Sequence, residues 1–273
     1  MSRPYTARDG RLKRHHLMPE SSSDLARLLS LIAHELRTPL SVTSGYVKML
    51  ASERPGPLND AQKHALGGAG RSCAHLTTVA TDLSLLGRLE RGEVSPQLVA
   101  IDLEAVAKEV VEAYVVHPDH PVTVSLTDGA AAPLTLQADP DHLKRALSAL
   151  LAAVVRAAPD DGTVRIGWKA LTASNGWSGV AGLDDGPRVL IGMALAERLD
   201  DLLLADASSL EPLDELQAGL GMALPVVRRL MGLEGGTILS ARESQALGVR
   251  LTLPIVTPPE SSTASGTDSE TAV

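Results

Sequence analysis

The stretch IAHELRTPLS, from Ile32 to Ser41, places a histidine, two charged residues, a threonine and a proline inside a helical pattern. His34 lies two positions from both Ile32 and Leu36, which is about 200° around a helix. We therefore expect its imidazole to face solvent, with Thr38 one turn further along the same face. Apolar residues recur at steps of three, four and seven, which predicts one long helix with a buried stripe: Leu25, Leu29, Ile32, Leu36, Leu40, Val47 and Leu50.

The chemistry of this stretch depends on its histidine. An exposed imidazole titrates near neutral pH and can act as a nucleophile, and Glu35 beside it can accept the ring proton or orient the ring. Pro39 removes one backbone hydrogen bond, so we expect a local kink. The alternative is an ordinary solvated histidine on a charged helix face.

A second helix follows a break, SERPGPLND, that contains two prolines and a glycine. Its apolar stripe runs through Ala65, Ala69, Cys73, Leu76, Leu83 and Leu86 and ends near LERGEVSP. Two long helices joined by a short break predict a helical hairpin. Because a second copy would bury its stripe best, we expect a homodimeric four-helix bundle.

The pattern becomes mixed after Pro96. Alternating stretches such as VTVSLTD, LTLQAD, GTVRIGWKAL and GVRLTLPI predict strands. Helical stretches are DLEAVAKEVVEAYVV, PDHLKRALSALLAAVVRAA and, after a glycine loop, GLGMALPVVRRLMGLEGG. This mixture predicts a two-layer α/β sandwich. The expected division is a disordered tail over 1–22, the hairpin over 23–96, the sandwich over 97–256 and a disordered tail over 257–273.

Composition narrows the classes of function. The 273 residues carry a net charge of −8, which argues against nucleic acid as the main partner. The chain has one cysteine and no run of about 18 apolar residues, so we expect a cytoplasmic protein without a disulfide or a membrane span. Aromatic residues make up 2% and there is no Phe, so the core must be aliphatic.

The motif HELRTPL resembles the phospho-accepting box of bacterial sensor histidine kinases, and GYVKML and DLSLLGRLERGEV resemble the dimerisation helices of that family. The resemblance implies that His34 is phosphorylated on nitrogen and that Glu35 assists its activation. It implies that Thr38 positions water for hydrolysis of a partner's aspartyl phosphate. The implied partners are a response-regulator receiver domain and a second copy of the chain, with another histidine kinase left open.

Later segments resemble the GHKL-type ATP-binding domain of the same family. In GLGMALPVVRRLMGLEGG, which resembles its second glycine box, Gly219 and Gly221 would close on phosphate. GLDDGPR resembles the first glycine box, where Asp184 would hold adenine beside Gly186, although Arg188 replaces a second glycine. Plain turns remain the alternative at both places.

The third box departs from the family. Ala149 and Ala153 replace two asparagines, one of which coordinates the Mg²⁺ bound to ATP, and alanine offers no oxygen ligand. Arg156 remains as a contact for phosphate, and the segment from Leu190 to Leu216 does not match the usual lid. The ATP domain is therefore predicted to be degenerate, with ATP and Mg²⁺ in doubt and autokinase activity weak or absent.

Three functions stay open: a histidine kinase, a histidine phosphotransferase or phosphatase that does not use ATP, and a pseudokinase scaffold. No metal site is expected, because HPDH at 117–120 lacks a third ligand nearby. We interpret Cys73 as a small core residue, and Trp168 and Trp177 as packing residues.

Overall fold

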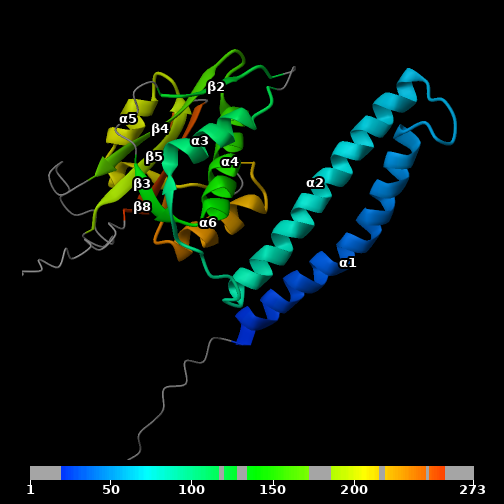
Figure 1. Ribbon diagram of the computed structural model, residues 1–273, viewed down its shortest axis with the longest axis horizontal. Coiled ribbons are helices and arrows are strands. Elements are labelled where there is room, and N and C mark those ends of the chain that lie inside the picture. Colours follow the sequence, from blue (N-terminus) through cyan, green and yellow to red (C-terminus); the bar gives the residue numbers. More distant parts are fainter. Residues whose placement is uncertain are drawn as a thin grey trace, which may run out of the picture. The chain divides into compact units, whose positions relative to one another are not determined.

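The computed structural model describes residues 20–116, 120–127, 134–171, 186–214, 219–243 and 246–255. The chain divides into two compact units between Val94 and Ser95, and each unit is described by itself (Figure 1). Nearly all of the two predicted tails lies outside the described residues.

The first unit is a helical hairpin, as predicted. Its helices are α1 (Glu20–Ala51) and α2 (Asp60–Glu90). A capping box begins α2: the Asn59 side chain accepts from the Gln62 N–H, and the Gln62 side chain accepts from the Asn59 N–H, both at 2.9 Å. Among the described residues, no helix is long and apolar enough to cross a membrane.

Small residues form the contact between α1 and α2. Ala33, Cys73 and Ala80 are buried, and so is Gly87 near the open end of the hairpin. Of the ten larger residues in the predicted stripes, five are exposed and five are half-buried in the single chain, and the prediction left their burial to a second copy. Helices that meet through alanine and glycine approach closely and leave bulky side chains outside. The exposed members of the predicted stripe are Leu25, Ile32, Leu36, Leu50 and Leu76.

The second unit contains a six-stranded sheet in the order β2-β4-β5-β8-β7-β6, in which only the β2–β4 pair is parallel. Its strands are β2 (Thr123–Leu126), β4 (Thr163–Leu171), β5 (Arg188–Leu195), β6 (Glu211–Pro212), β7 (Thr237–Glu243) and β8 (Ala246–Pro254). A separate antiparallel pair joins β1 (Val99–Asp102) to β3 (Thr135–Ala138).

Helices cover both faces of the large sheet. The helices α3 (Leu103–Glu112), α4 (Pro140–Ala157) and α6 (Ala223–Leu233) lie on one face (Figure 1). The short helix α5 (Leu199–Leu204) lies on the other face and packs on β4, β5 and β8. The predicted α/β sandwich is confirmed.

Strand β5 was not predicted, because it falls in the segment interpreted as a degenerate lid. Its residues from Arg188 to Ala194 are all buried. A strand covered on both faces reads as a continuous apolar run without alternation, so periodicity does not reveal it. The segment after Leu190 therefore supplies the centre of the sheet, and α5 follows it.

Candidate functional site

The histidine of the opening motif lies on the exposed surface of α1. His34, Glu35 and Thr38 are all exposed, as predicted for the face away from the helix contact. Thr38 follows His34 by four residues, so both side chains lie on one face of the helix. Glu35 is the next residue and lies about 100° around the helix from His34.

Pro39 lies inside α1, which continues through it to Ala51. Proline has no N–H, so the carbonyl of Glu35 has no helical donor four residues later. On the next turn, the Thr43 hydroxyl donates to the Pro39 carbonyl at 2.9 Å. The helix next to His34 therefore has one hydrogen bond fewer than its surroundings, and Figure 1 shows α1 curving along its length.

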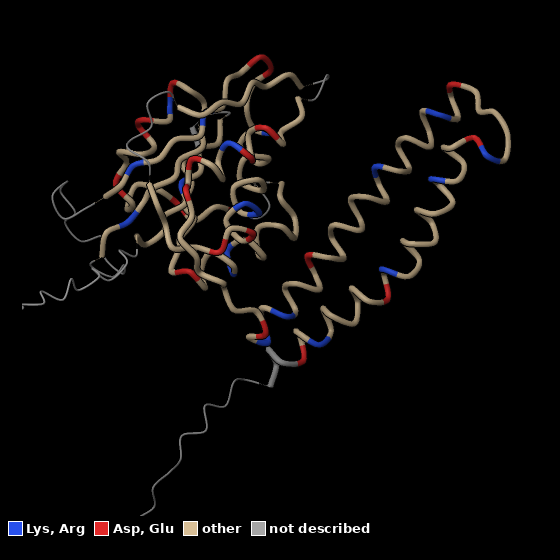
Figure 2. The backbone as a smooth tube through the Cα atoms, in the orientation of Figure 1, with Lys and Arg blue, Asp and Glu red and all other residues tan. Residues whose placement is uncertain are grey.

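A band without charged side chains crosses the hairpin beyond His34. No Lys, Arg, Asp or Glu occurs in residues 38–47 of α1 or 72–81 of α2 (Figure 2). The two stretches are neighbours, because a Cβ on Gly70 would lie 3.7 Å from Val47. Val42, Tyr46 and Leu76 are exposed within the band. The surface beside His34 is thus uncharged, with exposed apolar side chains among hydroxyl groups, and it is suited to contact with another protein.

The structure brings two of the predicted nucleotide residues together in the second unit. Arg156, in the last turn of α4, donates from Nη1 to the carbonyl of Gly219. Gly219 and Gly221 have φ of +60° and +52° in the loop before α6, a conformation that favours glycine. The guanidinium therefore lies against the loop that the sequence assigned to phosphate.

The described end of the predicted first glycine box, from Gly186 to Arg188, lies away from this loop. Asp184 lies outside the described residues, and Gly186 is an exposed residue before β5. Two residues on, Arg188 donates to the carbonyl of Gly235 at 3.2 Å, just after the end of α6. Gly219 lies before the start of α6. Gly186 and the loop at Gly219 are therefore at opposite ends of α6 and of β5, a strand about 23 Å long.

The predicted magnesium position does not fit a metal ion. Ala153 is buried and Ala149 half-buried on α4, and neither carries an oxygen. Among the described residues, no group of three His, Cys, Asp or Glu side chains is placed to hold a metal. His120 is already engaged, since its Nδ1 meets Asp160 at 2.7 Å and its Nε2 meets the Val155 carbonyl at 2.9 Å. His117 and Trp177 lie outside the described residues, whereas Trp168 and Cys73 are buried as predicted.

A buried polar cluster at the other end of α4 was not predicted, because no local sequence pattern indicates it. His142 Nδ1 lies 3.0 Å from Glu234 Oε1, and the backbone N–H of Asp139 donates to Glu234 Oε2 at 3.3 Å. Burial raises the pKa of Glu234 despite these hydrogen bonds. Partial burial also opposes ionisation of Asp139, but N–H groups of Gln97 and His142 lower the pKa of its carboxyl. The cluster fastens the N-terminus of α4 to the end of α6.

Comparison with known proteins identifies the first unit. Residues 24–92 match the family described as His Kinase A (phospho-acceptor) domain. The cell-division control histidine kinases PdhS of Brucella ovis and Brucella anthropi are 30% and 32% identical over 92 residues. Each alignment covers 33% of this chain and 9% of the relative, so the chain spans a small part of these proteins.

The whole fold also has a counterpart among solved structures. Full-length ShkA in complex with AMPPNP superposes with a TM-score of 0.58 and 21% identity over 85% of this chain and 46% of that one. Residues 24–92 are therefore similar in sequence to the phospho-acceptor domain of histidine kinases, and the chain as a whole shares the fold of the ShkA structure, a helical hairpin followed by an α/β sandwich.

Proposed function

We propose that this chain is a histidine phosphotransfer protein of two-component signalling. His34 would exchange a phosphoryl group with the aspartate of a response-regulator receiver domain. The observation that carries the proposal is the exposure of His34 within a matched phospho-acceptor domain, with Thr38 one turn away on the same face.

The transfer step uses groups that α1 already presents. A lone pair on one imidazole nitrogen attacks the phosphorus of the aspartyl phosphate, and an N–P bond forms. The P–O bond breaks, and its electron pair leaves with the aspartate carboxylate. Glu35 accepts the proton from the second ring nitrogen. In a separate phosphatase reaction, the Thr38 hydroxyl orients a water toward the aspartyl phosphate; the water oxygen bonds to phosphorus, the P–O bond to the aspartate breaks, and inorganic phosphate and the free carboxylate are released.

The second unit supports a phosphoryl donor other than ATP. Ala149 and Ala153 supply no oxygen ligand for Mg²⁺. After β5 the chain crosses to the face of the sheet opposite α4 and α6, so α5 does not cover the loop at Gly219. Arg156 already binds a carbonyl of that loop. These features favour a role for this unit in docking.

Pairing with a second copy is supported by the outer face of α1. Leu28, Leu31, Val42, Tyr46 and Met49 are between 41% and 61% exposed in the single chain. Water-exposed leucines in such number on one helix indicate a face that another helix covers. We propose a homodimeric four-helix bundle, with pairing to another histidine kinase as the alternative.

Light scattering tests this assignment. Leu31→Glu should dissociate the dimer, whereas Ser41→Glu should leave it intact. A dimer that survives Leu31→Glu would contradict the assignment.

The phosphotransfer proposal is tested by labelling the full chain. Receiver domains charged with a radiolabelled acyl phosphate would be mixed with the wild type and with His34→Gln. His75→Gln is the matched control, because His75 is another exposed helical histidine. We expect acid-labile label on the wild type and on His75→Gln and none on His34→Gln. Thr38→Ala should still accept label and should slow the loss of phosphate from the receiver. Equal labelling of His34→Gln would refute the assignment.

Autophosphorylation is the second candidate. It is favoured by the positive-φ glycines before α6 and by the AMPPNP bound in the ShkA structure, whose fold this chain shares. Incubation with Mg²⁺ and γ-labelled ATP separates the two candidates. Label on the wild type and not on His34→Gln would establish a kinase and a compensating ligand for Mg²⁺. We expect no label from ATP.

A further inference from the structure

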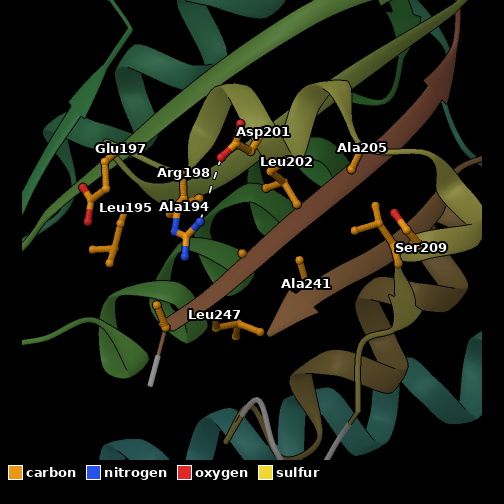
Figure 3. Close-up of a pocket in the computed structure, with 13 residues that line it drawn as sticks. Ala194, Leu195, Glu197, Arg198, Asp201, Leu202, Ala205, Ser209, Ala241 and Leu247 are labelled. Atoms are coloured by element: carbon orange, nitrogen blue, oxygen red, sulfur yellow. Dashed lines mark ion pairs between the residues drawn. The ribbon is translucent and has the colours of Figure 1, made fainter. Parts of the chain in front are cut away.

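A pocket on the far face of the large sheet lies outside every site described above. It has a volume of about 470 Å³ and is bounded by α5, the 3₁₀ turn Ala207–Ser209 and the strands β5, β7 and β8 (Figure 3). Cavities of this size are within the range that holds small organic ligands. The predicted site residues His34, Gly219 and Arg156 do not line it.

The walls of the pocket are aliphatic, and its volume comes from small side chains. Leucines from β5, α5 and β8 line it together with alanines that leave the space open. The apolar lining consists of Ala194, Leu195, Leu202, Ala205, Leu210, Ala241, Ala246, Leu247 and Gly248. This lining contains no aromatic ring. An apolar group of a ligand would therefore contact only aliphatic side chains in the pocket.

The charged residues of the lining are Glu197 and Arg198, in the turn from β5 into α5, and Asp201 on α5 itself. Glu197 and Arg198 are consecutive, and Figure 3 shows the guanidinium of Arg198 pointing into the pocket. Arg198 pairs with Asp201 at 3.9 Å, but the two side chains are 50% and 78% exposed. Exposed pairs of this kind contribute little, so a ligand carboxylate can compete with Asp201 for the guanidinium. One cation and two anions thus lie at the edge of an apolar cavity.

The far wall of the pocket is fixed in place. Buried Arg250 of β8 donates from Nη1 to the carbonyls of Ala205 at 2.6 Å and Leu202 at 3.4 Å, at the C-terminal end of α5. Leu202 also packs against Gly248, where a Cβ would lie 3.3 Å from its methyl group. A pocket whose walls are held in this way is preformed, which favours ligand binding.

We propose that this pocket binds a small zwitterion with a bulky aliphatic group, the chemistry of a branched amino acid or of a dipeptide made from such residues. The ligand carboxylate pairs with Arg198, its ammonium pairs with Glu197, and its side chains fill the space between Ala194, Ala241 and Leu247. Binding does not depend on His34, so this proposal and the proposed function fail independently.

The test is calorimetry and saturation-transfer NMR on the full chain with leucine and leucyl-leucine as separate probes. We expect at least one to bind, and the stronger binder tells whether a free amino acid or a peptide is the natural class. Isocaproate, which lacks the ammonium, and isoamylamine, which lacks the carboxylate, should each bind less well.

Two variants locate the site. Arg198→Gln, at an exposed side chain, should weaken binding by about ten- to a hundredfold, as expected for a lost charge-assisted hydrogen bond. Ala241→Leu should abolish it by filling the cavity. Arg54→Gln, at an exposed arginine of the hairpin, is the control and should bind as the wild type does. No binding of either probe, or equal binding by Arg198→Gln and the wild type, would overturn the proposal.

Discussion

Replacement of Gly87 by alanine should open the base of the helical hairpin. A Cβ at this position would lie 2.5 Å from Ser30 Oγ and 2.9 Å from the backbone carbonyl of Ala26. The hydroxyl can rotate away, but the carbonyl belongs to α1 and moves only with the helix. Arg91 bonds to the same two groups, at 2.8 Å to Ser30 Oγ and 3.1 Å to the Ala26 carbonyl. A shift of α1 would therefore also stretch these bonds.

The magnitude follows from two opposing terms. Alanine gains about 1 kcal/mol over glycine in a helix interior. Overpacking costs about 1–3 kcal/mol. Gly67 provides the control, because a Cβ there would meet only the flexible Arg71 side chain, at 3.6 Å. Gly67→Ala should stabilise α2 by about 1 kcal/mol, so Gly87→Ala should be less stable than Gly67→Ala by the overpacking cost of about 1–3 kcal/mol.

Native-state hydrogen exchange on the full chain measures this difference locally in α1 and α2. Exchange in the β5 and β8 peptides serves as an internal reference, because the second unit should not respond. If Gly87→Ala protected the hairpin as well as Gly67→Ala does, the close approach of the helices at Gly87 would be refuted.

Three further outcomes follow from buried or paired groups in the second unit. The Val155 carbonyl and the Asp160 carboxylate raise the pKa of His120. The stabilisation from protonated His120 is therefore complete below the pKa of the unfolded state and is lost as pH rises through the pKa of the folded state. His120→Gln should flatten this pH dependence of the unfolding free energy in urea, and an unchanged pH dependence would contradict the assignment. Arg250→Leu should cost about 1–3 kcal/mol, because two carbonyls at the end of α5 lose their donor, and hydrogen exchange should rise first in α5 rather than in α4. Burial raises the pKa of Glu234, so ionisation of its carboxyl lowers the unfolding free energy as pH rises through the pKa of the folded state. Glu234→Gln should remove this pH-dependent loss of stability. NMR titration of the Glu234 carboxyl should show a midpoint above that of a free glutamate.

The sequence predicted the elements in which apolar residues recur with a regular period along one face. The hairpin was readable because helical periodicity extends over two long segments, on either side of a break that contains two prolines and a glycine. Helix α4 was readable from its amphipathic pattern, and β4 and β8 from their strand-forming residues. The exposure of His34 followed from its angle to neighbouring apolar residues, although these larger residues turned out to lie on the outer surface of the single chain.

The candidate sites were harder to predict from the sequence, because each one depends on which helix and strand ends lie next to each other in the fold. The contact of Arg156 with Gly219 joins residues 63 positions apart, and no local pattern encodes it. The motif at Gly186 resembled a nucleotide box in letters alone. Its position became clear only from the pairing of Arg188 with Pro254 at the far end of β5. The pocket beside α5 could not be predicted, because the sequence does not distinguish an alanine that lines a cavity from an alanine in a close-packed core.

The glycines of the sheet explain how α5 comes to lie so close to the strands. A Cβ on Gly192 would lie 2.9 Å from methyl groups of Leu199 and Leu203, and one on Gly167 would lie 2.9 Å from Leu199. Only glycine at these positions lets α5 lie this close to the strands. A helix seated in this groove is held by packing on the face opposite α4 and α6, so α5 itself cannot also cover the loop at Gly219. The same packing places α5 where it forms one wall of the pocket at Arg198.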